Sequence, residues 1–240
     1  SCVLVTTPTV QMKEELERNG LKQEVVAFPN AIDFEKFNAY AQGKPKKGSK
    51  ASTKKTPKAG KGLKLIYFGR VSYEKNIEVL IHALHELLLQ KIPATLTITG
   101  SGPATDYLKS TAQVQGLEKS VIFQPALKGD ELAGHVGQHD VFVTASTIET
   151  QGLTVLEAMA SGLPCVGADY LGLKDSIKDG FNGYLFKPYD FRDLASKLEK
   201  LKSPALRKKL GEGAVRTARK FSVKRMADEA QALYKRVMEK

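Results

Sequence analysis

The feature that most constrains the fold of this chain is a regular alternation of short apolar runs and amphipathic segments from residue 63 onward. The apolar runs, which we predict to be strands, are residues 63–69, 94–100, 120–124, 140–146, 164–168 and 183–186. Helical patterns follow the first four runs, at residues 76–91, 104–115, 129–138 and 152–162. Continuous apolar strands separated by helices are typical of a parallel sheet that is covered on both faces. We therefore predict an α/β fold built on a doubly wound, Rossmann-like parallel sheet.

The segments on either side of this region have simpler patterns. They predict a strand at residues 2–8, a helix at 9–20 with Thr9 as its N-cap, and a strand followed by a turn at 24–33. Beyond residue 190 the pattern is helical only, which predicts carboxyl-terminal helices. Because the chain starts at Ser1 rather than at a methionine, we expect a fragment, a processed form or a trimmed form of a longer protein.

The net charge of +11 comes mostly from one short segment. Eight lysines and no acidic residue lie between Gly43 and Gly62, and without them the chain carries only +3. The segment contains no apolar residue larger than alanine, so burial cannot offset the entropy of ordering it, and we predict a flexible linker. Two uses remain open, a solvated insertion and a contact with an anionic membrane surface. Nucleic acid is disfavoured because no aromatic residue is interleaved with the lysines for base stacking.

The remaining composition is that of an ordinary globular protein. Cys2 and Cys165 are far apart and have no metal or redox spacing, which favours a reducing cytosol. No apolar run approaches the roughly 20 residues that a membrane-spanning helix needs. We expect a cytoplasmic protein, with peripheral attachment to the cytoplasmic membrane face as an alternative.

Two cations follow the first strand of the predicted sheet. In a doubly wound sheet, ligands bind beyond the carboxyl ends of the strands, where loops lead into helices. The loop at 69–75 places Arg70 and Lys75 beside Gly69, close to a predicted helix N-terminus. Guanidinium and ammonium groups at such a position can bind a diphosphate. The alternative is that both are surface cations on a loop.

The run "ETQGLTVLE" raises a second possibility, because two glutamates flank the start of a helix. If the helix starts near Gly152, Glu157 lies about 7.5 Å further along its axis, and Glu149 lies in the loop before it. The free amides of Leu153 and Thr154, between the two carboxylates, suit a phosphate. A nucleotide sugar, with a hydroxylated ring at each end and a diphosphate between them, fits this spacing. The simpler alternative is that both carboxylates only solvate a helix terminus.

Other motifs predict less. The run "GSGPAT" at 100–105 has Thr105 where a dinucleotide fingerprint needs its third glycine, so a tight strand-to-helix turn is the better interpretation. His135 and His139 have a spacing that can bind zinc, but no third ligand is evident. The sequence also lacks a D-x-D pair for a divalent ion. We expect no metal and no bound cofactor.

A set of motifs in a fixed order resembles the retaining glycosyltransferases of family 4. The motifs are "PNAID" (29–33), "FGRVSYEKN" (68–76), "GSGP" (100–103), "DVFVTAS" (140–146), the E-x7-E pair at 149 and 157, "ASGLPCVG" (160–167) and "GFNGYLF" (180–186). One departure is Ala31, where the family often has glycine. The resemblance implies a fold of two facing Rossmann-like domains, of which this chain is the carboxyl-terminal, donor-binding half.

The resemblance also implies residue roles. Arg70 and Lys75 would hold the donor diphosphate and stabilise the leaving group, Glu149 would contact the donor sugar, and Glu157 would contact the ribose. The implied nucleotide-sugar site is Gly69, Arg70, Lys75, Pro125, Leu127, Gly152, Leu153, Thr154 and Glu157, with the loop from Pro125 to Leu127 near the base. No metal is implied.

The family pattern divides the chain into four parts. Residues 1–37 resemble the tail of an amino-terminal acceptor domain or an inter-domain segment, and residues 38–62 are the Lys-rich linker. Residues 63–190 are the nucleotide-sugar-binding domain, and residues 191–240 are the carboxyl-terminal helices. An amino-terminal domain would supply the acceptor site, so catalysis by this chain alone is in doubt.

The predicted activity is transfer of a hexose with retention, from UDP-glucose as the first expectation or GDP-mannose as the second. The acceptor would be a glycan or a membrane lipid, since the run at 149–164 resembles bacterial and archaeal enzymes that glycosylate membrane lipids. Two alternatives stay open, a donor-binding module without turnover and a membrane-tethering or interaction protein that keeps only the fold.

Overall fold

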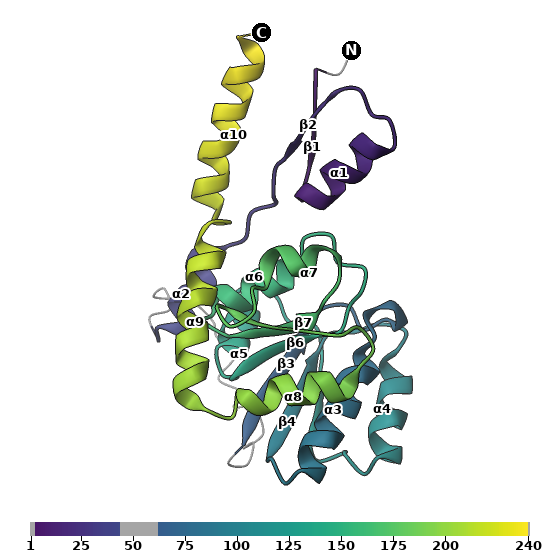
Figure 1. Cartoon of the computed structure of the whole chain (residues 1–240). Coiled ribbons are helices and arrows are strands. Elements are labelled where there is room, and N and C mark those ends of the chain that lie inside the picture. The colour runs from purple at the N-terminus through teal and green to yellow at the C-terminus, as the bar shows by residue number, and fades with distance from the viewer. Residues whose placement is uncertain (1–2, 44–61, 240) are drawn as a thin grey trace.

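A computed structural model of the chain describes residues 3–43 and 62–239. Figure 1 shows a large unit built on a six-stranded sheet, a small unit of two strands and one helix, and a long carboxyl-terminal helix that runs from the first toward the second. The Lys-rich stretch at 44–61, with the linker and membrane predictions that depend on it, lies outside the described residues.

The large unit contains a fully parallel sheet in the order β5-β4-β3-β6-β7-β8. Its strands are β3 (Leu63–Phe68), β4 (Ala94–Thr99), β5 (Val121–Gln124), β6 (Val141–Thr144), β7 (Cys165–Ala168) and β8 (Gly183–Phe186). The chain builds outward from β3 to β5, and then returns to place β6 on the other side of β3. The predicted doubly wound sheet is confirmed, and its strand order reverses between β3 and β6.

Helices cover both faces of the sheet, as the apolar strands require. They are α3 (Ile77–Leu89), α4 (Thr105–Val114), α5 (Gly129–Val136), α6 (Leu153–Ala160) and α7 (Leu171–Ser176). The predicted carboxyl-terminal helices are α8 (Phe191–Lys200), α9 (Pro204–Arg219) and α10 (Val223–Met238). Because α8 packs on α3 and α9 packs on α6, these two helices complete the core of the large unit.

One helix was not predicted. The helix α2 (Phe34–Ala41) begins at Asp33, whose carboxylate caps it by accepting a hydrogen bond from the Lys36 amide. It buries Phe34 and Phe37 against α5 and α6. The boundary predicted between residues 37 and 38 therefore falls inside a packed helix, because these two aromatic side chains belong to the core of the large unit.

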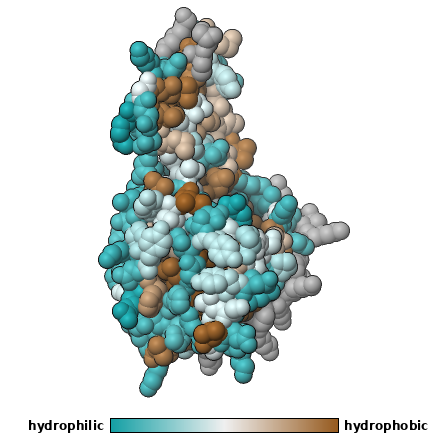
Figure 2. Space-filling model, turned by 90° about the vertical axis from the view of Figure 1, so that its right-hand side faces the viewer, coloured by the Kyte–Doolittle hydropathy of each residue, from teal (hydrophilic) through white to brown (hydrophobic). Residues whose placement is uncertain are grey.

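The small unit consists of β1 (Leu4–Thr7), α1 (Val10–Arg18) and β2 (Glu24–Ala27), and its two strands are parallel. The predicted N-cap is confirmed, since the Thr9 hydroxyl accepts a hydrogen bond from the Met12 amide at 3.3 Å. Apolar side chains are exposed on this unit and on α10, among them Val3, Tyr234 and Met238. Figure 2 shows apolar side chains gathered in this upper part of the molecule.

Two stretches of chain join the units at one place. The segment between β2 and α2 meets the turn between α9 and α10, where the Ile32 amide donates a hydrogen bond to the Phe221 carbonyl at 2.8 Å. Further along α10, Arg236 pairs with Glu24 of β2 at 2.7 Å. Within residues 3–43 and 62–239, no helix combines the length and the apolar character that crossing a membrane requires.

Candidate functional site

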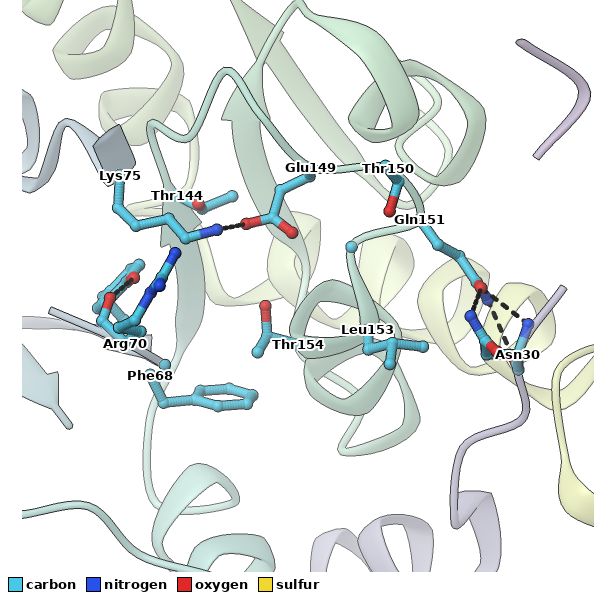
Figure 3. A pocket seen from close by; sticks show the side chains of 13 residues that line it. Asn30, Phe68, Arg70, Lys75, Thr144, Glu149, Thr150, Gln151, Leu153 and Thr154 are labelled. Carbon is cyan, nitrogen blue, oxygen red and sulfur yellow. Dashed lines mark hydrogen bonds and ion pairs between the residues drawn. The ribbon is translucent and has the colours of Figure 1, made fainter. Parts of the chain in front are cut away.

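A hollow of about 280 Å³ lies where the strand order reverses. It is lined by the carboxyl ends of β3 and β6, by the start of α6, and by Asn30 of the segment that leads to α2 (Figure 3). In a parallel sheet, the loops on either side of such a point diverge to opposite faces, which leaves room for a ligand. The first and fourth of the predicted strand-to-helix loops therefore form the candidate site.

The loop after β4 supports this site from behind. A Cβ atom on Gly100 would lie 1.9 Å from the Gly69 carbonyl oxygen, and one on Gly102 would lie 2.2 Å from the Val71 oxygen. The Val71 amide donates a hydrogen bond to the Ser101 carbonyl at 3.0 Å. The glycines of "GSGP" therefore allow close backbone approach, as the tight-turn interpretation predicted, and they hold the Gly69–Arg70 turn in place.

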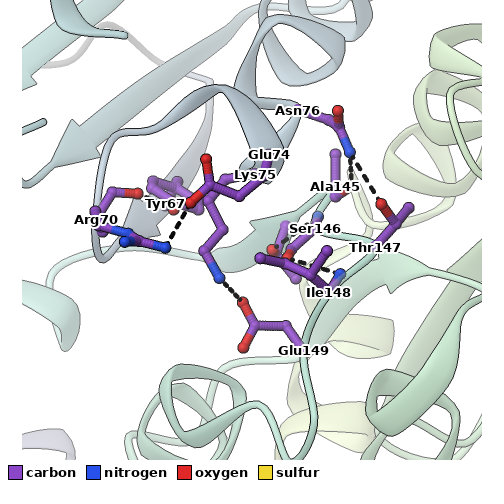
Figure 4. Close-up of polar contacts among 11 residues, drawn as sticks. Tyr67, Arg70, Glu74, Lys75, Asn76, Ala145, Ser146, Thr147, Ile148 and Glu149 are labelled. Carbon is purple, nitrogen blue, oxygen red and sulfur yellow. Dashed lines mark hydrogen bonds and ion pairs between the residues drawn. The ribbon is translucent and has the colours of Figure 1, made fainter. Parts of the chain in front are cut away.

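The two predicted cations lie at the edge of the hollow, and each has an acidic partner (Figure 4). Lys75 ends a short 3-10 helix, Tyr73–Lys75, and its Nζ is 2.6 Å from the Glu149 Oε1. This pair is mostly shielded from solvent, with 14% of the Lys75 side chain and 23% of the Glu149 side chain exposed. Arg70 is more exposed and pairs with Glu74 four residues later.

A neighbouring asparagine ties the same two loops together. Asn76 has a left-handed backbone (φ 51°) between the 3-10 helix and α3. Its Nδ2 donates hydrogen bonds to the Ala145 carbonyl at 3.3 Å and to the Thr147 hydroxyl at 3.4 Å. The loops after β3 and β6 are therefore linked by this amide as well as by the Lys75–Glu149 pair (Figure 4).

The start of α6 supplies backbone donors to the hollow. Gly152 has a left-handed backbone (φ 70°) and is the N-cap, but it has no side chain that could cap the helix. The first helical hydrogen bond to Gly152 comes from Val155, so the amides of Leu153 and Thr154 precede the internal bonding of the helix. These amides form the positive end of the α6 dipole, and this end and the Thr154 side chain face the hollow (Figure 3). Such a helix end suits an anion.

Glu157 lies further along α6 and is not among the residues that line this hollow. It is half-buried and faces α2, where Lys36 and Asp33 are its charged neighbours. Burial raises the pKa of Glu157 to about 7, with Lys36 lowering it and Asp33 raising it further. Pro125 and Leu127, in the loop after β5, are also outside the lining.

The structure thus brings together seven of the ten predicted site residues, namely Gly69, Arg70, Lys75, Glu149, Gly152, Leu153 and Thr154. Pro125, Leu127 and Glu157 lie beyond the walls of the hollow. The roles of all ten residues stay predictions.

The sequence did not indicate the contact between Gln151 and Asn30. Gln151 is 5% exposed, and its Oε1 accepts hydrogen bonds from the Asn30 amide at 2.8 Å and from the Asn30 Nδ2 at 3.0 Å. Its Nε2 donates to the Asn30 carbonyl at 2.9 Å. Both residues lie in motifs that the sequence singled out, but a separation of 121 residues gave no signal for pairing them.

The two histidines with zinc-like spacing have protein partners. The His135 Nε2 is 3.0 Å from the Thr99 hydroxyl, and the His139 Nδ1 is 2.9 Å from the His135 carbonyl oxygen. Burial is the largest cause that lowers the pKa of His139, to about 4. Across the described part of the chain, no group of three or more histidine, cysteine or acidic side chains is arranged to hold a metal.

The strand order and the place of the hollow put the large unit in the Rossmann-like class of nucleotide-binding folds. The sequence matches the family model described as "Glycosyl transferases group 1" over residues 49–217. The chain therefore belongs to this glycosyltransferase family, and the predicted resemblance is confirmed.

Individual relatives agree with the family and differ in what their names say they do. An alpha-monoglucosyldiacylglycerol synthase of Streptococcus pneumoniae is 32% identical over 191 residues, which is 80% of this chain and 42% of the relative. A D-inositol 3-phosphate glycosyltransferase of Streptomyces bingchenggensis is 29% identical over 96% of this chain and 52% of the relative. The chain thus spans about half the length of these curated relatives.

Solved structures show the same fold. A sucrose-phosphate synthase from Thermosynechococcus elongatus superposes with a TM-score of 0.80 at 25% identity. The match covers 99% of this chain and 58% of that one. The predicted Rossmann-like fold with carboxyl-terminal helices is confirmed.

Proposed function

We propose that this chain is the donor-binding part of a retaining glycosyltransferase that takes a hexose from a nucleotide diphosphate sugar. The observation that carries the proposal is the hollow at the sheet reversal, where two cations, a helix N-terminus and Glu149 converge. We propose UDP-glucose as the first donor, a choice that the "glucosyl" in the name of the streptococcal relative favours. GDP-mannose is the second.

The diphosphate would bind at the start of α6. Amides of Leu153 and Thr154 would donate to its oxygens, with Arg70 and Lys75 on the opposite side. As the bond between the sugar C1 and the diphosphate oxygen breaks, negative charge grows on the leaving group. Preorganised cations therefore stabilise the transition state more than they stabilise the ground state. These cations supply the positive charge that a metal supplies in other diphosphate sites, so the proposal includes neither a metal nor a cofactor.

Both cations have an acidic partner, and each would also have to contact the phosphates. The Arg70–Glu74 pair is exposed, and pairs of this kind are weak because solvent screens them. The Lys75–Glu149 pair is more buried, but an ammonium group has three donors and can hold a carboxylate and a phosphate together. Glu149 would then lie beside the phosphate-linked sugar, where its second oxygen can accept a bond from a hexose hydroxyl.

Glu157 and the loop at 125–127 would hold the other end of the donor. A ribose on the α2 side of the diphosphate would lie toward Glu157, and a base beyond it would lie toward Pro125 and Leu127. Burial is the main cause of the raised pKa of Glu157, and ribose hydroxyls that donate to its carboxylate would offset part of that desolvation.

The small unit would belong to a second domain that holds the acceptor. A parallel pair of strands with one helix has too little buried surface to be stable alone. The acceptor would be a glycan or a lipid, and the Lys-rich segment at 44–61 would contact an anionic membrane on the cytoplasmic face. A donor-binding module without turnover is the second candidate, because the hollow at the sheet reversal accounts for donor binding by itself.

Titration with nucleoside diphosphates tests the donor site. Arg70→Ala and Lys75→Ala should each weaken UDP or GDP binding by about 1.5–3 kcal/mol, the value of a charge-assisted contact, and barely affect the nucleoside. Lys109→Ala, on an exposed face of α4, is the matched control and should change neither. Equal losses for diphosphate and nucleoside would mean that the two cations are structural.

The two glutamates should separate in the same assay. Glu157→Gln should weaken every ligand that contains the ribose, including UDP. Glu149→Gln should leave UDP affinity intact or higher, since it frees Lys75, and should weaken UDP-glucose relative to UDP. Identical losses for both ligands in both variants would refute the assignment.

A further inference from the structure

The backbone of Arg70 is held by a tyrosine of the strand that precedes it. Tyr67 lies in β3 and is 3% exposed, and its hydroxyl donates a hydrogen bond to the Arg70 carbonyl at 2.7 Å (Figure 4). This distance is typical of a well-formed O–H···O bond. Tyr67 is also one of the residues that line the hollow at the sheet reversal. Its side chain therefore connects the wall of the hollow to the residue that carries the guanidinium.

The turn around Arg70 is fixed on both sides. The amides of Gly69 and Val71 donate to carbonyls of β4 and of the loop after it, each at 3.0 Å. A Cβ atom on Gly69 would lie 3.4 Å from the Tyr67 hydroxyl oxygen, so this hydroxyl packs directly against the turn. The two neighbouring amides are thus bonded on the β4 side, and the Arg70 carbonyl is bonded to Tyr67.

The side chain of Arg70 is much less constrained than its backbone. It is 64% exposed and forms an ion pair with Glu74, and solvent makes an exposed pair of this kind weak. The guanidinium can therefore turn from Glu74 to a phosphate. A guanidinium that binds a phosphate through two parallel bonds must lie in a narrow range of orientations, which a fixed backbone helps to select.

The Tyr67 hydroxyl keeps its proton in this environment. Burial is the largest cause that raises the pKa of Tyr67 above its usual value. The carboxylates of Glu149 and Glu74 raise it further, and Arg70 lowers it. The hydroxyl therefore remains a donor to the Arg70 carbonyl throughout the neutral pH range.

We propose that Tyr67 is a positioning residue for the donor diphosphate, and that it acts through Arg70. By holding the Arg70 carbonyl, its hydroxyl sets the direction from which the guanidinium reaches the phosphates. The inference rests on the proposed function, because it requires a diphosphate in the hollow. A tyrosine that only packed in the core would change the free energy of unfolding, but it would not separate a nucleoside diphosphate from its nucleoside.

Titration of Tyr67→Phe with UDP and with uridine tests this role. UDP affinity should fall about fivefold, the effect of one lost hydrogen bond, and uridine affinity should stay the same. Tyr40→Phe is the matched control, because the Tyr40 hydroxyl is also buried but has no hydrogen-bond partner within residues 3–43 and 62–239. It should change the affinity of neither ligand. A fall for both ligands in Tyr67→Phe, or an equal fall in Tyr40→Phe, would overturn the proposal.

The same substitution in an Arg70→Ala chain separates positioning from packing. The Arg70→Ala chain keeps the backbone carbonyl that accepts from Tyr67 and loses only the guanidinium. If Tyr67 acts through Arg70, adding Tyr67→Phe to this chain should lower UDP affinity by less than about twofold. An undiminished fivefold fall would show that Tyr67 acts on the fold, and would refute the proposal.

Amide exchange tests the hold on the turn without a ligand. The Val71 amide, one residue after Arg70, should exchange faster in Tyr67→Phe than in the wild type and in Tyr40→Phe. Unchanged exchange at Val71 would contradict the proposal. Failure of the donor site is distinguishable, because UDP would then not bind the wild-type chain, whereas a wrong role for Tyr67 leaves that binding intact and removes only the coupling to Arg70.

Discussion

Replacing Gln151 with alanine should destabilise the chain more than the same substitution at an exposed glutamine, because it removes three hydrogen bonds at once. The bonds join Gln151 to the amide, the side chain and the carbonyl of Asn30 at 2.8, 3.0 and 2.9 Å. At about 1 ± 0.5 kcal/mol each, their loss amounts to about 2–4 kcal/mol. For a chain of this size, each kcal/mol lowers the melting temperature by roughly 2–4 °C, so the expected fall is roughly 4–16 °C.

Urea unfolding and calorimetry measure this loss, and amide exchange localises it. The Asn30 amide donates to the Gln151 side chain, so its exchange should accelerate in the variant by about tenfold for each 1.4 kcal/mol of lost local protection. Gln113→Ala, on the exposed face of α4, is the matched control and should stay within about 0.5 kcal/mol of the wild type.

Two outcomes would contradict the reasoning. A free energy of unfolding for Gln151→Ala that matches the Gln113→Ala control would mean that solvent replaces the three bonds without cost. A large loss with unchanged exchange at Asn30 would mean that the effect comes from packing elsewhere and not from this contact.

Three further predictions follow from the site and its surroundings. Because the folded-state pKa of Glu157 is raised to about 7, its contribution to stability is present below pH 4.5 and is lost as the pH rises through 7; Glu157→Gln should flatten this part of the stability curve. The pKa of His139 is lowered to about 4, so stability should fall as the pH drops from about 6.5 toward 4; His139→Phe should make that slope shallower, while His135, whose pKa burial also lowers, keeps part of it. Gly172→Ala should cost about 1–3 kcal/mol in urea unfolding, since its Cβ would overlap the Thr150 oxygen, whereas Gly137→Ala meets only ordinary contacts and should cost less; equal costs would contradict the overlap.

The strands could be predicted because each is a local pattern. The six runs from residue 63 to residue 186 became β3 to β8 with small changes at their ends, and their apolar character on both faces indicated a parallel, covered sheet. The helix α2 was missed because its two buried aromatics are followed closely by the Lys-rich segment, whose composition suggested a linker.

The candidate site was predictable where its residues belong to loops at the sheet edge, as for Arg70, Lys75 and Glu149. It was not predictable where a contact depends on how distant segments pack. Nothing local indicates that Gln151 bonds to Asn30, or that Glu157 turns toward α2 and away from the hollow.

The two stretches of chain that join the units meet at Ile32 and Phe221, and this meeting point determines how the small unit can move. The two stretches of chain are hydrogen-bonded where they meet and form the hinge of the small unit. Arg236 of α10 contacts Glu24 of the small unit at 2.7 Å. In any rotation, displacement grows with distance from the axis. Asn30 is two residues from Ile32, so the Asn30–Gln151 contact lies close to this axis and should persist when the small unit rotates. The helix α1 lies farther from the axis and should move a longer distance over α7. A small angular change would thus open the hollow of about 380 Å³ that α1 and Leu171 line, and leave the hollow at the sheet reversal almost undisturbed.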